Sequence, residues 1–141
     1  MSGTQVLITH REEFAAAHKL ADPQRTEEEN RLLYGPCASL HGHNYGLEVS
    51  VEGAVDPSTG MVMDLNRLME LMRREVLREV DHRYLNEDVP FLRGKIPTAE
   101  NLAIAFWERL VPHFASGTAR LARIRIVESA ANWAEYCGPL S

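Results

Sequence analysis

Residues 41–53 read His41-Gly42-His43-Asn44-Tyr45-Gly46-Leu47-Glu48-Val49-Ser50-Val51-Glu52-Gly53, and this stretch decides the fold. From His43 onward it alternates apolar and polar residues, a period of two that is typical of a β-strand with one buried face. Both histidines share that face with the apolar residues, which are Tyr45, Leu47, Val49 and Val51. The opposite face carries Asn44, Glu48, Ser50 and Glu52. We therefore predict a half-buried strand that begins with two inward-facing histidines.

An imidazole on an apolar face needs a partner, and a metal ion suits two converging imidazoles. A catalytic zinc site usually has three protein ligands and one open position. His18, on a neighbouring predicted strand, is the best candidate for the third ligand. For the pair alone, ordinary polar residues of a core are the favoured interpretation. The third histidine and the nearby Cys37 favour a metal site formed by His18, His41 and His43.

Composition and charge narrow the classes of function. The chain has 141 residues, which we treat as one domain, 1–141, large enough for a real core. Its formal net charge is -5, which argues against nucleic acid or an anionic membrane as a partner. It has no membrane-length apolar run and no signal-peptide pattern. Two cysteines one hundred residues apart make no disulfide framework, so we expect reduced thiols and a cytoplasmic location.

The predicted elements follow the order β-β-α-α-β-β. Strands are predicted at residues 5–17, 43–53, 121–128 and 133–137, and residues 22–36 are expected to form a loop with one helical turn around 27–33. Asp64 and Thr98 are typical N-caps, so they mark the starts of two amphipathic helices. Two helices can cover one face of a four-stranded antiparallel sheet, an α+β fold. Such a small sheet leaves exposed edges, which favours an oligomer.

At three further positions the residue type allows either a functional role or an ordinary structural one. Cys37 is either a small buried hydrophobe or, beside a bound cation, a thiolate that serves as base or nucleophile. Asp81 and His82 lie at the predicted end of the first helix. They are either ordinary surface residues or a carboxylate–imidazole pair that relays a proton. Glu128 shares the apolar face of its strand with Ile124 and Ile126. It either reaches solvent at the strand end or accepts hydrogen bonds from a ring that presents adjacent N–H donors.

Six motifs occur in an order that is typical of one enzyme family. They are Phe14-Ala15-Ala16-Ala17-His18, Cys37-x-x-x-His41-Gly42-His43-Asn44-Tyr45, Asp56-Pro57-x-x-Gly60-Met61-Val62-Met63-Asp64, Asp81-His82-Arg83-x-Leu85-Asn86, Pro97-Thr98-Ala99-Glu100-Asn101 and Val127-Glu128. Over nearly its whole length the chain closely resembles the 6-pyruvoyltetrahydropterin synthase/6-carboxytetrahydropterin synthase family. The resemblance implies the tunnelling fold, in which trimers close their sheets into a barrel and two trimers stack into a hexamer.

The resemblance also implies a role for each candidate residue. It implies zinc held by His18, His41 and His43, a catalytic set of Cys37, Asp81 and His82 assembled across a subunit interface, and a substrate site that contains Glu128, as the pterin anchor, and Thr98. The implied substrate is 7,8-dihydroneopterin triphosphate. No nucleic acid or membrane is implied as a partner.

Sequence details favour one branch of this family without excluding the other. Three residues separate Cys37 from His41, as in the carboxy branch of the queuosine and deazapurine pathway, whereas the pyruvoyl branch of biopterin synthesis usually has a longer spacing. The segments 42–45 and 60–64 are more similar to the pyruvoyl branch. Ala99 stands where that branch often has a second threonine. We expect a 6-carboxytetrahydropterin synthase, with a 6-pyruvoyltetrahydropterin synthase as the alternative.

Two functions of other classes remain as hypotheses. A non-catalytic zinc- and pterin-binding module would keep the three histidines but would not need Cys37 together with Asp81 and His82. A zinc hydrolase would need a carboxylate base beside the metal, and no glutamate follows either histidine of the pair in the helical spacing of that class. Both hypotheses therefore account for fewer of the residues than a pterin synthase does.

Overall fold

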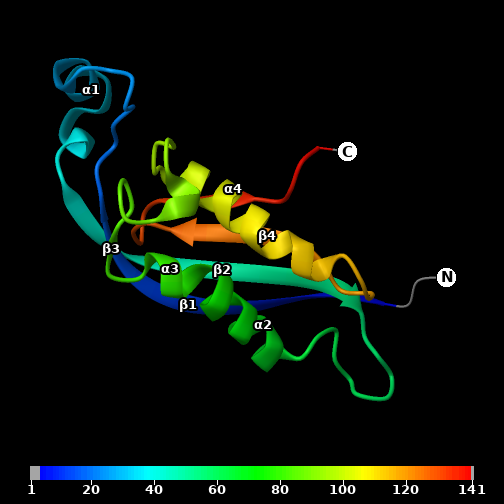
Figure 1. Cartoon of the computed structure of the whole chain (residues 1–141). Helices are drawn as coiled ribbons and strands as arrows, with labels where there is room; N and C mark the ends of the chain where they lie inside the picture. Colours follow the sequence, from blue (N-terminus) through cyan, green and yellow to red (C-terminus); the bar gives the residue numbers. More distant parts are fainter. Residues whose placement is uncertain (1–3, 141) are drawn as a thin grey trace.

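The computed structural model describes residues 4–140, and its centre is a pair of long antiparallel strands (Figure 1). β1 (Gln5–His18) pairs with β2 (His41–Ala54) along their full lengths, so that His18 lies opposite His41. The alternation predicted for this stretch is confirmed, because its apolar residues from Tyr45 to Val51 are fully buried. Their burial sets the register of the pair, since a slip by one residue would turn every side chain to the other face.

The sheet has five strands in the order β3-β1-β2-β4-β5. β4 (Arg120–Val127) and β5 (Trp133–Tyr136) form the predicted C-terminal antiparallel hairpin. The predicted count of four strands is therefore one too few. The extra strand, β3 (Arg83–Tyr84), has two residues and runs parallel to β1 beside Ala16 and Ala17. Two residues cannot display a period of two, so the sequence pattern gave no signal for it.

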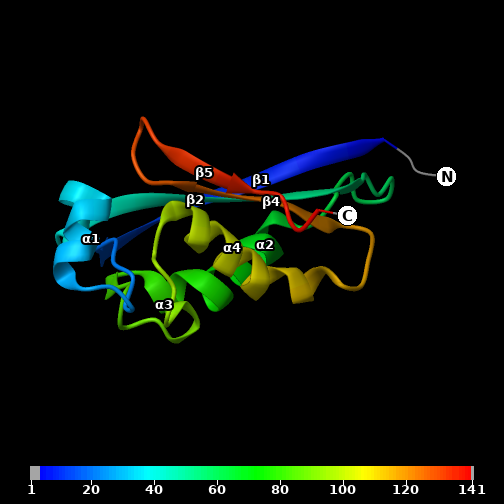
Figure 2. The same cartoon turned by 90° about the horizontal axis from the view of Figure 1, so that it is seen from above.

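Both predicted helices lie on one face of the sheet, as Figure 2 shows. The first is continuous through α2 (Leu65–Met72), a π-helical segment (Arg73–Leu77) and α3 (Arg78–Val80), and the second is α4 (Ala99–Leu110). The predicted caps are confirmed, because the Asp64 and Thr98 side chains accept backbone N–H groups of the first turns. None of the helices in residues 4–140 is long and apolar enough to cross a bilayer.

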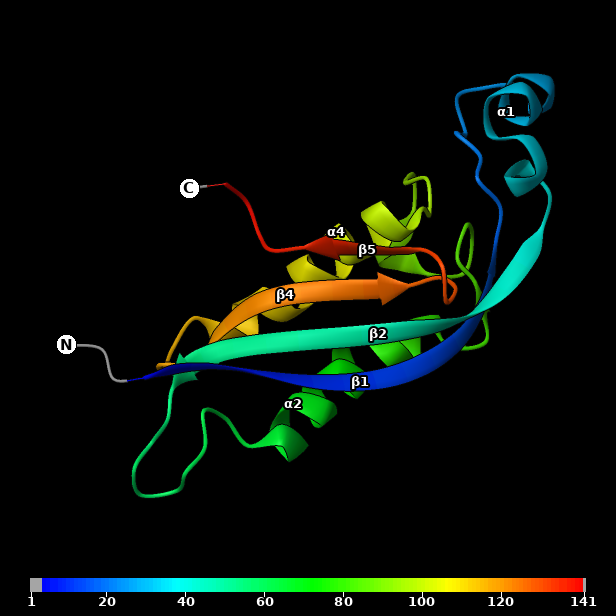
Figure 3. The same cartoon turned by 180° about the vertical axis from the view of Figure 1, so that it is seen from behind.

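The N-terminal loop contains more helix than the single turn predicted. α1 (Glu27–Tyr34) stands at the end of the β1–β2 pair, away from the other helices (Figures 1 and 3). A capping box explains its length, because Thr26 accepts from the backbone N–H of Glu29 and the Glu29 carboxylate accepts from that of Thr26. The described part of the chain also contains three short 3₁₀ helices: Gly35–Ala38, Pro90–Leu92 and Val111–Phe114.

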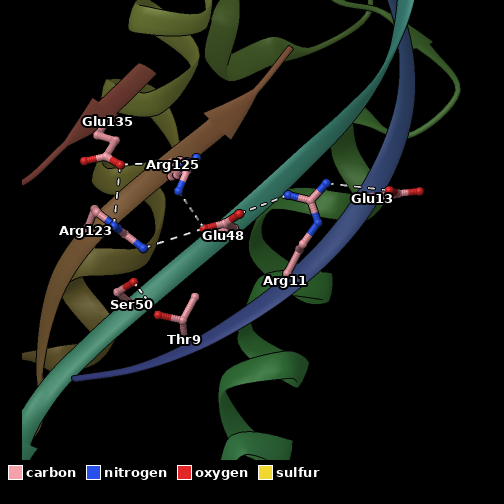
Figure 4. Close-up of polar contacts among 8 residues, drawn as sticks. All are labelled: Thr9, Arg11, Glu13, Glu48, Ser50, Arg123, Arg125 and Glu135. Carbon is pink, nitrogen blue, oxygen red and sulfur yellow. Dashed lines mark hydrogen bonds and ion pairs between the residues drawn. The ribbon is translucent and has the colours of Figure 1, made fainter. Parts of the chain in front are cut away.

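The other face of the sheet carries no helix among residues 4–140 (Figure 3), and the side chains at its centre are polar. Figure 4 shows its centre, where Glu48 accepts a hydrogen bond of 3.0 Å from Arg11 and lies within ion-pair distance of Arg123 and Arg125. The Arg11 guanidinium lies against Gly46, where any Cβ would collide with it. Charges on this face are thus paired with one another, and the hydrophobic core lies wholly between the sheet and α2–α4.

Candidate active site

Three histidines converge at the end of the β1–β2 pair, on the face that the helices cover. His18 ends β1, His41 begins β2 opposite it, and His43 follows on the same side of β2. The ring centroids lie 4.5 Å apart for His18 and His41, 5.1 Å for His18 and His43, and 5.0 Å for His41 and His43. One ring nitrogen of each lies within 4.8 Å of the other two. The predicted histidine triad is therefore assembled by strand register alone.

Backbone carbonyls fix the orientation of two of these rings. His18 Nδ1 lies 2.8 Å from the Pro97 carbonyl oxygen, and His41 Nδ1 lies 2.7 Å from that of Ser39. A carbonyl can only accept, so both Nδ1 atoms carry the proton. Each Nε2 atom is then left with its lone pair, the arrangement that metal-ligating histidines use. The contact with Pro97 could not be predicted from the sequence, because it uses a backbone carbonyl and not a side chain.

The electrostatics of the triad also fit a metal ion. Burial lowers the pKa of His18 and of His43, which keeps both imidazoles neutral near pH 7. His43 Nε2 is buried and has no hydrogen-bond partner within residues 4–140. Zinc binds imidazole nitrogen at about 2.0–2.1 Å, so small rotations of the side chains would bring all three nitrogens onto one ion. Three imidazole nitrogens this close together fit the donor set of a catalytic zinc site.

Two further polar groups lie beside the triad. Glu128, immediately after β4, places Oε1 3.4 Å from His43 Nε2, so its carboxylate turns toward the triad as its position on the apolar face of the strand predicts. The hydroxyl of Tyr45 lies 3.2 Å and 3.3 Å from the two ring nitrogens of His18. Burial raises the pKa of Tyr45, so this hydroxyl stays neutral. Tyr45 was not predicted as a site residue, although it follows His43 on the same face.

Asp81 and His82 lie on the far side of β1, next to β3. His82 Nδ1 lies 3.0 Å from Asp81 Oδ1, which also accepts the backbone N–H of Ala15 at 2.9 Å. The backbone of His82 has a φ of 62°, and its side chain is 82% exposed. The carboxylate therefore lies within ion-pair distance of an exposed imidazole. His43 and His82 line one depression of about 630 Å³, together with the small residues of β1.

The two remaining predicted residues make no side-chain hydrogen bond to the triad among residues 4–140. Cys37 is exposed on the 3₁₀ helix Gly35–Ala38, and its carbonyl accepts the backbone N–H of Leu20 at 2.8 Å. Thr98 uses its hydroxyl to cap α4. It lies next to Pro97, whose carbonyl holds His18. Among residues 4–140 the structure thus joins the triad with Glu128, whereas Cys37, Asp81 and His82 make no hydrogen bond or ion pair to it.

Comparison with known proteins identifies the family. A family model described as 6-pyruvoyl tetrahydropterin synthase matches residues 7–139. The chain belongs to this family. A Dictyostelium discoideum protein named 6-pyruvoyl tetrahydrobiopterin synthase is 40% identical over 133 residues, which cover 94% of this chain and 96% of that protein. An Archaeoglobus fulgidus protein, named provisionally as a 6-carboxy-5,6,7,8-tetrahydropterin synthase, is 32% identical over 122 residues, with 86% and 87% coverage.

Solved structures agree with the family assignment. The structure of Caenorhabditis elegans 6-pyruvoyl tetrahydropterin synthase superposes with a TM-score of 0.91 at 35% identity, and the match covers 99% of each chain. The predicted tunnelling fold is therefore confirmed, with the sheet of a single chain left open. The chain is an enzyme of the pterin synthase class, a lyase, as the motifs of the 6-pyruvoyl tetrahydropterin synthase family predicted.

Proposed function

We propose that the chain is a zinc-dependent 6-pyruvoyltetrahydropterin synthase, which eliminates triphosphate from 7,8-dihydroneopterin triphosphate. The observation that carries this proposal is the triad of converging histidines with the Glu128 carboxylate 3.4 Å from His43. A metal and an acceptor for ring N–H groups side by side suit a pterin whose side chain bears adjacent hydroxyls. The names of the similar proteins supply the substrate class.

The choice of branch departs from the expectation drawn from the sequence. The short spacing between Cys37 and His41 favoured the carboxy branch. The more similar relatives carry the pyruvoyl name, and the match to a carboxy-branch name is more distant and provisional. We therefore adopt the alternative as the proposed activity. A 6-carboxytetrahydropterin synthase of queuosine biosynthesis is the second candidate, and the three-residue spacing is the observation that favours it.

In the proposed reaction each side chain of the site has its own role. Bound zinc would act as a Lewis acid toward the side-chain hydroxyls. Glu128 accepts the ring N–H and the exocyclic amine of the pterin and so sets its orientation. The Cys37 thiolate moves the proton on the side-chain carbon next to the ring. His82, held by Asp81, exchanges the hydroxyl proton through Nε2, and triphosphate leaves by elimination.

Incubation of the enzyme with 7,8-dihydroneopterin triphosphate tests this activity. Free triphosphate, measured by ion chromatography, is expected to accumulate in proportion to the zinc content of the enzyme. Protein treated with a chelator is the control, and activity should return when zinc is added back. A zinc-loaded preparation that binds the pterin but releases no triphosphate would leave only the non-catalytic binding module.

A Glu128→Gln substitution tests the pterin anchor. It keeps the volume of the side chain but removes its charge and one acceptor, and loss of a charged hydrogen bond costs about 1.5–3 kcal/mol. We expect substrate binding to weaken by about 10- to 100-fold, with zinc content unchanged. Glu135→Gln is the matched control, because Glu135 lies on the helix-free face in the arginine network. Unchanged KM and kcat in Glu128→Gln would assign Glu128 to solvent at the strand end.

We also propose that the active unit is an oligomer, a hexamer of two stacked trimers. β3 covers β1 only at Ala16 and Ala17, so most of the outer edge of β1 is unpaired among residues 4–140. β5 is the other edge strand of the sheet. Unpaired edges of this length are ready to accept a strand of another chain. Cys37 is exposed and makes no hydrogen bond to the triad among residues 4–140, which supports a site completed by a neighbouring subunit.

Mixed assemblies test whether the site is shared. Cys37→Ala and His82→Ala chains should each be inactive alone. If the two groups act from different subunits, co-assembly of the two variants restores complete sites at some interfaces, and part of the activity should return. Steady-state assays of the mixture after denaturation and refolding together measure this recovery. A mixture as inactive as its components would place both groups in the same subunit.

A further inference from the structure

Asn86 forms a two-hydrogen-bond clamp on the backbone of Lys19. Its Oδ1 accepts the Lys19 N–H at 2.9 Å, and its Nδ2 donates to the Lys19 carbonyl oxygen at 2.9 Å. The amide itself sits in a tight turn, where the backbone N–H of Asp88 donates to the Tyr84 carbonyl. Leu85, the preceding residue, is 1% exposed and anchors this turn in the core. The turn and the buried Leu85 side chain therefore fix the position of Asn86.

The two hydrogen bonds of Asn86 extend the row of hydrogen bonds between the edge of β1 and the segment that contains β3. Along the free edge of β1, Asp81 accepts the N–H of Ala15, the two residues of β3 pair with β1, and the N–H of Leu85 donates to Ala17 at 2.9 Å. Asn86 adds the last two bonds, beyond the end of β1, with its side chain. The segment that carries His82 is thus fastened to β1 by a side chain at each end, Asp81 at one and Asn86 at the other.

The clamped residue lies in a segment that touches two parts of the proposed site. His18, on one side of Lys19, is a proposed zinc ligand. Leu20, on the other side, donates its N–H to the Cys37 carbonyl at 2.8 Å. β1 ends at His18, so no strand pairing holds Lys19 and Leu20. Within residues 4–140, the side-chain bonds from Asn86 are those that fix the Lys19 peptide.

We propose that Asn86 is a positioning residue that holds residues 18–20 in place, and so sets His18, the backbone of Cys37 and the His82 segment relative to one another. It touches none of the reacting groups, and it acts through Lys19. The inference rests on the proposed function for its zinc-release and activity measurements, whereas the hydrogen-exchange measurement is independent of it. Residues that orient a metal ligand typically change metal affinity or activity by about 10- to 100-fold when they are removed.

Zinc release provides the test. We expect the zinc-loaded Asn86→Ala protein to lose its metal to a chromogenic chelator about 10- to 100-fold faster than the parent, and its kcat to fall more than its KM rises. Asn30→Ala is the matched control, because Asn30 makes the same pair of bonds to the backbone of Asp22, at 2.9 Å and 3.2 Å, away from the triad. It should release zinc at the rate of the parent. Equal release rates for the parent and Asn86→Ala would overturn the proposal.

Two further measurements keep the test decisive. If Asn86→Ala does not fold, Asn86→Asp replaces it, because this isosteric change keeps the acceptor for Lys19 N–H and sets an oxygen against the Lys19 carbonyl. In the parent protein, hydrogen exchange should show Lys19 and Leu20 N–H protected, and rapid exchange at both would contradict the clamp. A parent that binds no zinc would refute the proposed function, whereas the exchange measurement would still decide on the clamp.

Discussion

A double variant, His41→Ala/His43→Ala, is expected to be isolated without zinc and to release triphosphate about 10³-fold more slowly than the parent, corresponding to about 4 kcal/mol. The loss follows from the geometry, because the two side chains supply two of three imidazoles within 4.8 Å of one another. A single remaining histidine cannot hold an ion in a catalytic site. Elemental analysis of protein purified without added metal, together with the triphosphate assay, measures both effects.

The control for this variant uses histidines outside the triad. His10 pairs with Glu12 on β1, and His113 lies 3.6 Å from Glu75 near the end of the second helix. His10→Ala/His113→Ala should therefore retain zinc and activity. Near-stoichiometric zinc that persists in the His41→Ala/His43→Ala protein would show that the metal lies elsewhere, and would remove the basis of the proposed site.

Asp81→Asn is expected to lower kcat by about 10²–10⁴-fold while zinc content stays unchanged. In the parent, Asp81 Oδ1 lies 3.0 Å from His82 Nδ1 and accepts the N–H of Ala15. An amide in its place loses the charge that stabilises protonated His82. If the amide donates to Nδ1, the proton moves to Nε2 and His82 can no longer accept one there.

Steady-state kinetics and metal analysis check the Asp81→Asn prediction. Asp56→Asn is the control, because Asp56 is an exposed carboxylate in the turn after β2, where its hydrogen bonds are to Ser58. A kcat for Asp81→Asn equal to that of the parent would reduce Asp81 to a structural partner of the Ala15 N–H. His82 would then act without a carboxylate behind it, or would not act at all.

The parts of the fold that could be predicted are those marked in the sequence by a periodic pattern or by a typical capping residue. The alternation in β2 and the caps Asp64 and Thr98 were read directly from residue type and spacing. β3 was not predictable, because its two residues are too few to show a period of two, and the bonds that flank them come from the side chains of Asp81 and Asn86. The π-helical segment (Arg73–Leu77) also lacks a distinct period in so short a stretch.

The same distinction applies to the candidate site. Strand parity predicted the side on which His41, His43 and Glu128 lie, and the structure confirms it. The partner of His18 is the carbonyl of Pro97, a backbone group that every residue possesses, so no residue type could reveal it. The spacing between Cys37 and His41 did not decide the branch either, because a tether length alone does not fix where a thiolate stands.

The measurement that tests the account most directly is the ratio of acetaldehyde to triphosphate in one reaction mixture with 7,8-dihydroneopterin triphosphate. Elimination and rearrangement leave the side-chain carbon skeleton whole, whereas the carboxy reaction cleaves it. We predict triphosphate and 6-pyruvoyltetrahydropterin with no acetaldehyde above the enzyme-free control. Acetaldehyde in equal amount to triphosphate, with 6-carboxytetrahydropterin as the pterin product, would contradict the proposed reaction.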